Sequence, residues 1–135
     1  MRSLSALLLL VVLPAPALAC RFASGEVHEA SLYYGLGSSS LDEYGDETVK
    51  ALAANFTGCE VIYIASGHID ASELGSNAGL GQARAEGART RLQGQGIPAR
   101  DILVRDMKFD RPAQPTAANA REPLNRRVEL VMVVR

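Results

Sequence analysis

One stretch, residues 61–92, constrains the fold more than any other part of this 135-residue chain. It begins with a β-rich apolar run, Val61-Ile62-Tyr63-Ile64, and ends with a helix-like segment from about Leu80. A polar loop rich in Gly, Ser and Asn lies between them. A strand, a polar turn and a helix form the first half of a βαβ unit. We therefore expect a sheet covered by helices, with a ligand position at the carboxyl end of this strand.

The other segments complete an α+β pattern. Ser40 is of a type that caps helices, and the helix that it would cap carries apolar residues at 3–4 spacing. The order β-α-β-α-β-β predicts a two-layer sandwich in which two helices pack on a mixed four-stranded sheet. The expected strands are 28–34, 60–66, 101–105 and 127–134, and the expected helices are 41–56 and 80–93.

Two charged residues flank the polar loop. Asp70 follows the strand, and Arg84 lies in the first turns of the helix. A carboxylate accepts hydrogen bonds from an ammonium group, and a guanidinium forks onto a carboxylate with two bonds. Together the two side chains fit a zwitterionic amino-acid head group. The other interpretation of the same residues is that Asp70 caps a turn and Arg84 is a solvated helix residue.

A longer motif runs through this stretch and returns at the end of the chain. Gly67-His68-Ile69-Asp70 is followed by Asn77, by a helix with small and leucine residues at helical spacing, and finally by N-R-R-V-E. In this order and at these separations the pieces resemble the OmpA-like C-terminal domain shared by OmpA, Pal and MotB, over about residues 28–135. The residues that carry the resemblance are Gly67, His68, Asp70, Asn77, Leu80, Gly81, Arg84, Ala85, Ala88, Leu92, Gly96, Ile97 and Asn125-Arg126-Arg127-Val128-Glu129.

The resemblance implies a protein that binds peptidoglycan non-covalently and anchors or spaces something in the cell envelope. In the family, the Asp of G-H-T-D binds the amino group of diaminopimelate in the stem peptide, and the Arg of R-A binds its carboxylate. Asp70 and Arg84 stand at these two positions, and Asn77, Ile69 and Arg127 are the implied supporting residues. The sequence offers no general base with an orienting partner, so we expect no enzyme, no cofactor and no metal site.

The chain departs from the family pattern in four places. Ile69 replaces Thr, and Ala83 replaces the first Arg of the R-R-A motif. The interval from Asp70 to Asn77 is shorter by a residue, and segment 106–112 lacks both glycines of the family's G-Y-G-E-x-x-P loop. These departures motivate a second hypothesis, an OmpA-like protein-interaction module whose peptidoglycan site is degenerate.

The N-terminus has the pattern of a secretory signal peptide. A positive start at Met1-Arg2 is followed by an apolar run over 4–13 and a small-x-small cleavage site at Ala17-Leu18-Ala19. This run is too short to span a membrane, and no other stretch suggests a transmembrane segment after cleavage. The expected organisation is a signal peptide over 1–19, a lead-in over 20–27 and one OmpA-like domain over 28–135.

Charge and compartment narrow the expected partners. The formal net charge of −1 provides no basic field for nucleic acid. We expect a protein of the periplasm and cell envelope whose partner is peptidoglycan, with an envelope protein as a further candidate partner.

The two cysteines, Cys20 and Cys59, allow two interpretations. Cys20 directly follows the expected cleavage site, where a bacterial lipoprotein carries its lipid, and lipidation would associate the chain with the outer membrane. However, Ala17 and Leu18 reverse the usual lipoprotein order, and lipidation would leave Cys59 as a free thiol in an oxidising compartment. We favour a disulfide between Cys20 and Cys59, which would stabilise the fold by about 3–4 kcal/mol.

Overall fold

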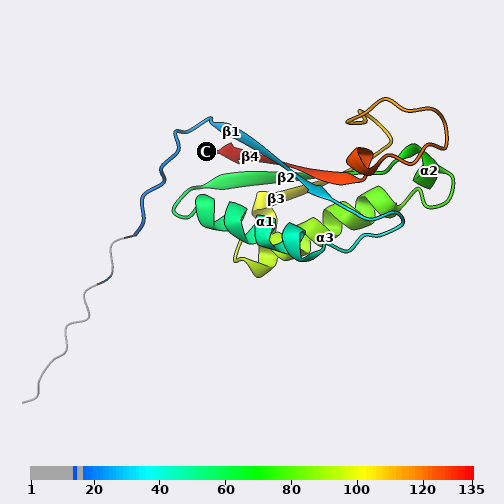
Figure 1. Ribbon diagram of the computed structural model, residues 1–135. Coiled ribbons are helices and arrows are strands. Elements are labelled where there is room, and N and C mark those ends of the chain that lie inside the picture. The colour runs from blue at the N-terminus through cyan, green and yellow to red at the C-terminus, as the bar shows by residue number, and fades with distance from the viewer. Residues whose placement is uncertain (1–13, 15–16) are drawn as a thin grey trace, which may run out of the picture.

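The computed structural model describes residue 14 and residues 17–135; most of the expected signal peptide lies outside the described residues. These described residues form four strands, three helices and two short 3₁₀ turns, arranged as in Figure 1. The strands are β1 (Val27–Tyr33), β2 (Val61–His68), β3 (Ile102–Lys108) and β4 (Arg127–Val134). The helices are α1 (Glu43–Asn55), α2 (Ala71–Leu74) and α3 (Leu80–Gly94), and the 3₁₀ turns are η1 (Ala99–Asp101) and η2 (Pro123–Asn125).

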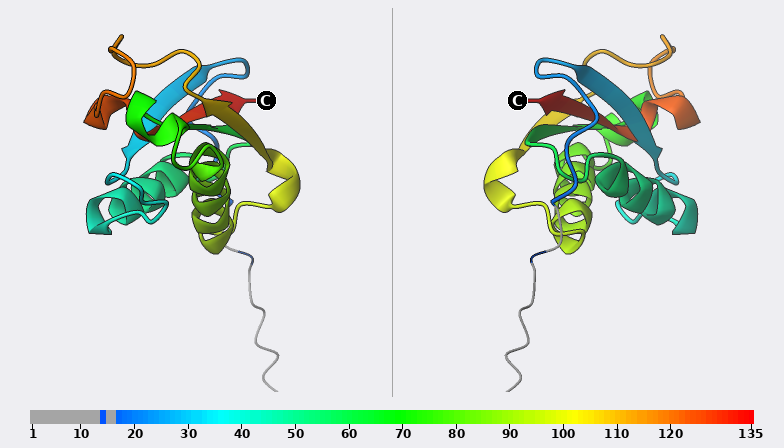
Figure 2. Two further views of the ribbon diagram at one scale, coloured as in Figure 1. Left: turned by 90° about the vertical axis from the view of Figure 1, so that its right-hand side faces the viewer. Right: turned by 90° about the vertical axis from the view of Figure 1, so that its left-hand side faces the viewer.

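The four strands form one mixed sheet in the order β1-β4-β2-β3. β4 pairs antiparallel with both β1 and β2, whereas β2 and β3 are parallel. Figure 2 shows α1 and α3 side by side on one face of this sheet. The predicted α+β sandwich is confirmed, and the strands and the two long helices follow the predicted β-α-β-α-β-β order.

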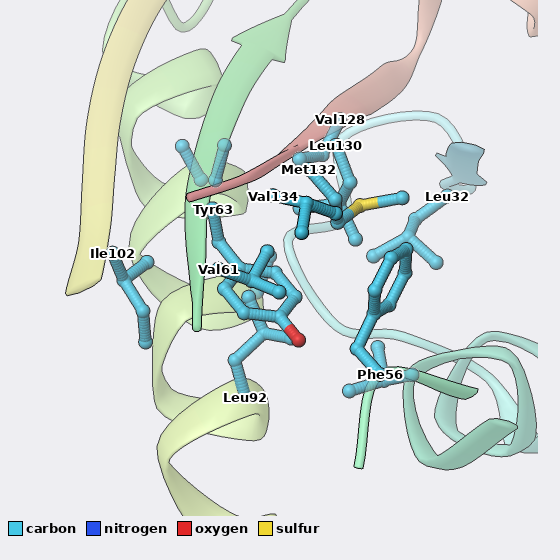
Figure 3. Packing of buried hydrophobic residues seen from close by; sticks show 14 of the residues in the cluster. Leu32, Phe56, Val61, Tyr63, Leu92, Ile102, Val128, Leu130, Met132 and Val134 are labelled. Carbon is cyan, nitrogen blue, oxygen red and sulfur yellow. The ribbon is translucent and has the colours of Figure 1, made fainter. Parts of the chain in front are cut away.

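The hydrophobic core lies between the sheet and the two long helices (Figure 3). The central strand β2 contributes Val61, Tyr63 and Ala65, and α3 contributes a stripe of small and aliphatic residues. Because side chains alternate across a strand, every second residue of β4 enters the core. The β4 core residues are Val128, Leu130, Met132 and Val134, and those of α3 are Ala85, Ala88 and Leu92.

The N-terminus of α1 differs from the prediction. The helix begins at Glu43, and its N-cap is Asp42, whose Oδ1 accepts a hydrogen bond of 2.8 Å from the Gly45 amide. Ser40 was therefore the wrong cap; its own amide donates to Ser38 Oγ, which keeps it within the preceding loop. A carboxylate at the cap also interacts favourably with the positive end of the helix dipole.

Two strands run further than predicted, and one short helix was not predicted. β2 extends to His68 rather than residue 66, and β3 extends to Lys108 rather than residue 105. The additional helix, α2, is a single turn within the polar loop. Asp70 therefore lies between two regular elements, β2 and α2, rather than in a long loop.

A pair of glycines lets α3 begin directly against the end of β2. A Cβ atom placed on Gly67 would lie 1.8 Å from the carbonyl oxygen of Gly81, and one on Gly81 would lie 2.9 Å from the carbonyl oxygen of Gly67. Only residues without a side chain permit such an approach of two backbones. The contact sets the position of the first turns of α3, and hence of Arg84.

The predicted disulfide between Cys20 and Cys59 is present, with Cα atoms 4.5 Å apart. It joins the segment before β1 to the residues just before β2. A disulfide uses the sulfur to which a lipid would attach, so the two interpretations of Cys20 exclude one another.

Among the helices of the described residues, none has the length and apolar character that crossing a bilayer requires.

Candidate functional site

Asp70 lies between β2 and α2 and is fully buried. Its Oδ1 accepts hydrogen bonds from the Ser72 hydroxyl (2.7 Å) and the Glu73 amide (3.0 Å). Its Oδ2 accepts from Arg126 Nη1 (3.0 Å) and the Glu122 amide (3.2 Å). Burial on its own would raise the pKa of this carboxyl, but the hydrogen bonds, led by those from Ser72 and Arg126, outweigh it and lower the pKa. Asp70 is thus a buried, ionised carboxylate that caps α2.

Arg84, on α3, is also fully buried, and each of its five N–H groups donates a hydrogen bond. Nε donates to the Ser38 carbonyl (2.8 Å), Nη1 to the His68 carbonyl (2.9 Å), and Nη2 to the Gly35 carbonyl (3.2 Å). The remaining N–H groups fork onto the carboxylate of Glu73, at 2.7 Å and 2.9 Å. Arg84 is therefore not the solvated helix residue of the second interpretation.

Glu73 connects the two predicted site residues. Its Oε2 accepts from the Asp70 amide (3.1 Å), and its Oε1 accepts from the Gly37 amide (2.9 Å). Together with the Asp70 cap this forms a capping box, in which each side chain accepts from the other residue's amide. Glu73 is 2% exposed and forms a buried ion pair with Arg84.

The structure thus brings Asp70 and Arg84 into one buried network, but it gives each a charged partner from the chain itself. Asp70 pairs with Arg126, and Arg84 pairs with Glu73. Two carboxylates and two guanidinium groups balance, which is the condition under which buried charges are tolerated. An external ammonium or carboxylate can enter only by exchange with one of these internal partners.

The predicted supporting residues lie at different distances from this network. Ile69 is buried, and its amide donates to the Lys108 carbonyl (3.0 Å), which holds the end of β2 in place. The side chain of Asn77 is exposed, in the loop between α2 and α3. Arg127 does not contact Asp70; its neighbour Arg126 does.

Arg127 belongs to a second polar cluster, formed around Glu129. It donates to the Glu129 carboxylate and to the Arg111 carbonyl. His68 lies beside them, with Nδ1 donating to the Asp110 carbonyl (3.1 Å) and Nε2 3.4 Å from the Glu129 carboxylate. Burial lowers the pKa of the His68 imidazole. These contacts hold the segment between β3 and β4 and do not complete the Asp70–Arg84 network.

Sequence reasoning missed Glu73 and Arg126. The spacing Asp70-x-x-Glu73, directly after a strand, is a capping-box pattern and would have indicated that these side chains interact. Arg126 stands in the N-R-R-V-E motif, but the supporting role was assigned to its neighbour Arg127. Within the part of the chain that the structure describes, no cluster of three His, Cys, Asp or Glu side chains could hold a metal ion.

No protein-family model and no curated protein matches the chain. Several solved structures do. The OmpA-like domain of FopA1 from Francisella tularensis is 15% identical, with a TM-score of 0.60 over 92% of this chain and 94% of that one. The cell wall anchor of the T6SS from Pseudomonas aeruginosa is 20% identical, with a TM-score of 0.64 over 81% of this chain and 82% of that one. The peptidoglycan-associated lipoprotein from Burkholderia pseudomallei is 23% identical, with a TM-score of 0.59 over 76% of this chain and 88% of that one.

At these identities the likeness concerns the fold. The placement of both long helices on one face of a mixed four-stranded sheet agrees with this likeness. The resemblance predicted from the sequence is confirmed at this level: the chain has the fold of the OmpA-like domains.

Proposed function

We propose that the chain binds peptidoglycan non-covalently through the diaminopimelate of the stem peptide, and so anchors or spaces a component of the bacterial cell envelope. The observation that carries the proposal is the buried network that holds Asp70 and Arg84 together in an OmpA-like fold. The side chain of diaminopimelate ends in an ammonium and a carboxylate, which match an aspartate and an arginine fork. Two solved structures of similar fold, a cell wall anchor and a peptidoglycan-associated lipoprotein, support it.

The proposal includes a location in the periplasm. The disulfide supports it, because disulfides persist in oxidising compartments and are rare in the cytosol. The proposed role is binding rather than catalysis, since the network offers saturated ion pairs and no free nucleophile with a neighbouring base.

The test is co-sedimentation with purified sacculi that contain diaminopimelate. Arg84→Lys keeps the charge but loses the two-pronged fork, and Asp70→Asn keeps the shape but loses the charge. Each should weaken retention by about 2 kcal/mol, roughly thirtyfold. Lys50→Ala, which removes only an exposed partner of Glu47, should sediment like wild type.

Two further comparisons sharpen this test. Sacculi that carry lysine in place of diaminopimelate lack the second carboxylate, so wild type should bind them weakly. The loss should be about as large as that caused by Arg84→Lys on diaminopimelate sacculi. Circular dichroism of each variant must first establish that it is folded, because both substituted residues are buried. Wild type that stays in the supernatant with every sacculus type would contradict the proposal.

A second candidate is an OmpA-like protein-interaction module with a degenerate peptidoglycan site. The observation that favours it is that Glu73 and Arg126 already neutralise both of the proposed ligand-binding side chains. On this hypothesis the network has only a structural role. Wild type would then fail to sediment with sacculi of either type, and its partner would be another envelope protein.

A further inference from the structure

The buried network contains an internal counterpart for each charge of a zwitterionic ligand. Glu73 presents a carboxylate to Arg84, and Arg126 presents a guanidinium to Asp70. We propose that Arg84 and the amides of Gly37 and Asp70 form a carboxylate-binding site that the chain's own Glu73 occupies, and that a peptide carboxylate binds there by displacing Glu73. The inference rests on the proposed function only for the identity of that external ligand.

The contacts of Glu73 are those of a bound ligand carboxylate. Each oxygen accepts one N–H of the Arg84 fork and one backbone amide, from Gly37 on Oε1 and from Asp70 on Oε2. Four donors from three separate segments of the chain therefore converge on one carboxylate. Such a charge-assisted, two-pronged arrangement is the strongest form in which proteins bind a carboxylate.

The site has no spare donor through which a second carboxylate could bind beside Glu73. All five N–H groups of Arg84 are used, and the guanidinium is fully buried. Binding must therefore be an exchange. Replacing one carboxylate by another leaves the number of buried charges unchanged, so the exchange avoids the large cost of an unpaired buried guanidinium.

Glu73 is carried by a shorter element than its partners in the site. α2 is a single helical turn, and a turn of this length has little stability of its own. The segment after it, residues 75–79, is exposed. By contrast, Asp70 follows the central strand β2, and Arg84 lies on the long helix α3. Local opening of such a weakly supported segment is the expected low-energy motion of the domain.

The test removes the internal carboxylate and supplies one from solution. Glu73→Ala leaves a space in front of the Arg84 fork, and sodium acetate should fill it. Thermal unfolding of this variant is followed in an acetate series, with sodium chloride added to hold ionic strength constant. Acetate at about ten times its dissociation constant should raise the midpoint by roughly 5–10 °C, with a saturable dependence on concentration.

Two matched proteins control for general effects of acetate. Wild type still has Glu73 in the site, and the double variant Glu73→Ala with Arg84→Met lacks the fork; neither should show the saturable shift. Equal shifts in all three proteins, or no shift in Glu73→Ala, would overturn the inference. If Glu73→Ala is unfolded without acetate, its refolding on addition of acetate becomes the readout, and failure to refold overturns the inference in the same way.

Sacculus binding by Glu73→Gln separates this inference from the proposed function. The variant keeps the size of the side chain but lacks its charge, so a peptide carboxylate should displace it more easily and retention should rise several-fold above wild type. An acetate effect without sacculus binding by any protein would sink the proposed function and keep the carboxylate site. Equal sacculus binding by wild type and Glu73→Gln, without an acetate effect, would keep the proposed function and sink the carboxylate site.

Discussion

Asp70 has two structural roles, of which the sequence indicated only one. It caps α2 through the Glu73 amide, as the structural interpretation expected, and it also holds a buried ion pair with Arg126. A residue that must be ionised to satisfy four donors cannot be replaced by an isostere without loss. The negative charge that would let Asp70 bind an ammonium ligand is therefore also essential for the local structure.

Asp70→Asn should destabilise the protein in a pH-dependent way. At pH 7 we expect a loss of about 2–4 kcal/mol in the free energy of unfolding, because an amide cannot accept from all the donors that face Asp70. The pKa of Asp70 is lowered in the folded state, so its contribution is present above about pH 4 and is lost as the pH falls through the lowered pKa.

Urea titrations of both proteins between neutral and acidic pH measure this dependence. The gap between wild type and Asp70→Asn should be largest near neutrality and should narrow below pH 4. Asp110→Asn changes an exposed carboxylate and should leave stability nearly unaltered throughout. A gap that stays constant down to the acid limit would show that the charge of Asp70 is not what stabilises the fold.

At the scale of elements, the contact between β2 and α3 determines where Arg84 lies. The two backbones meet at Gly67 and Gly81, with no side chain between them. From this start α3 runs along the sheet, and Arg84 reaches the carbonyl of His68 at the end of β2. A shift of α3 away from β2 would lengthen that bond, so the packing of these elements and the geometry of the fork are coupled.

Gly67→Ala tests this close approach. The new methyl group would lie 1.8 Å from a backbone oxygen, so α3 must move, and we expect a loss of about 2–3 kcal/mol in the free energy of unfolding. Gly94→Ala is the matched control, because nothing lies within 4 Å of its Cβ position at the end of α3. It should be neutral or stabilising by up to about 1 kcal/mol. Equal unfolding curves for Gly67→Ala and wild type would mean that the helix and strand are not held at this distance.

Elements of different length were predictable to different degrees. The strand at residues 61–64 and the helix from Leu80 are long enough for their apolar pattern to indicate both their type and their place in the core. α2 is only one turn, and no periodicity can identify an element of that length. The available signal was its capping box: one interpretation of the sequence has Asp70 cap a turn, but it does not include Glu73 as the partner. Asp70 follows the strand and Arg84 lies on the helix, as predicted, whereas their charged partners within the chain were not predicted.

Seen as a whole, the molecule separates its covalent crosslink from its candidate site. The disulfide lies just before β2 begins, and the Asp70–Arg84 network lies at the opposite end of the same strand. Figure 1 shows α2, which carries Glu73, at that opposite end. The hydrophobic core fills the space between these ends. The disulfide should therefore stabilise the fold without changing the geometry of the Asp70–Arg84 network.

Removing the disulfide provides the test at this scale. Reduction, or the double variant Cys20→Ser with Cys59→Ser, should lower the free energy of unfolding by about 3–4 kcal/mol, because the bond closes a separation of 39 residues in the unfolded chain. Mass spectrometry of the untreated protein should show the two-hydrogen deficit of the bond.

Reductant should then have no further effect on the double variant, and the folded variant should sediment with sacculi as wild type does. If reductant leaves the unfolding midpoint of wild type unchanged, the crosslink does not stabilise the domain. If the double variant folds but fails to sediment with sacculi, the disulfide and the Asp70–Arg84 network are coupled.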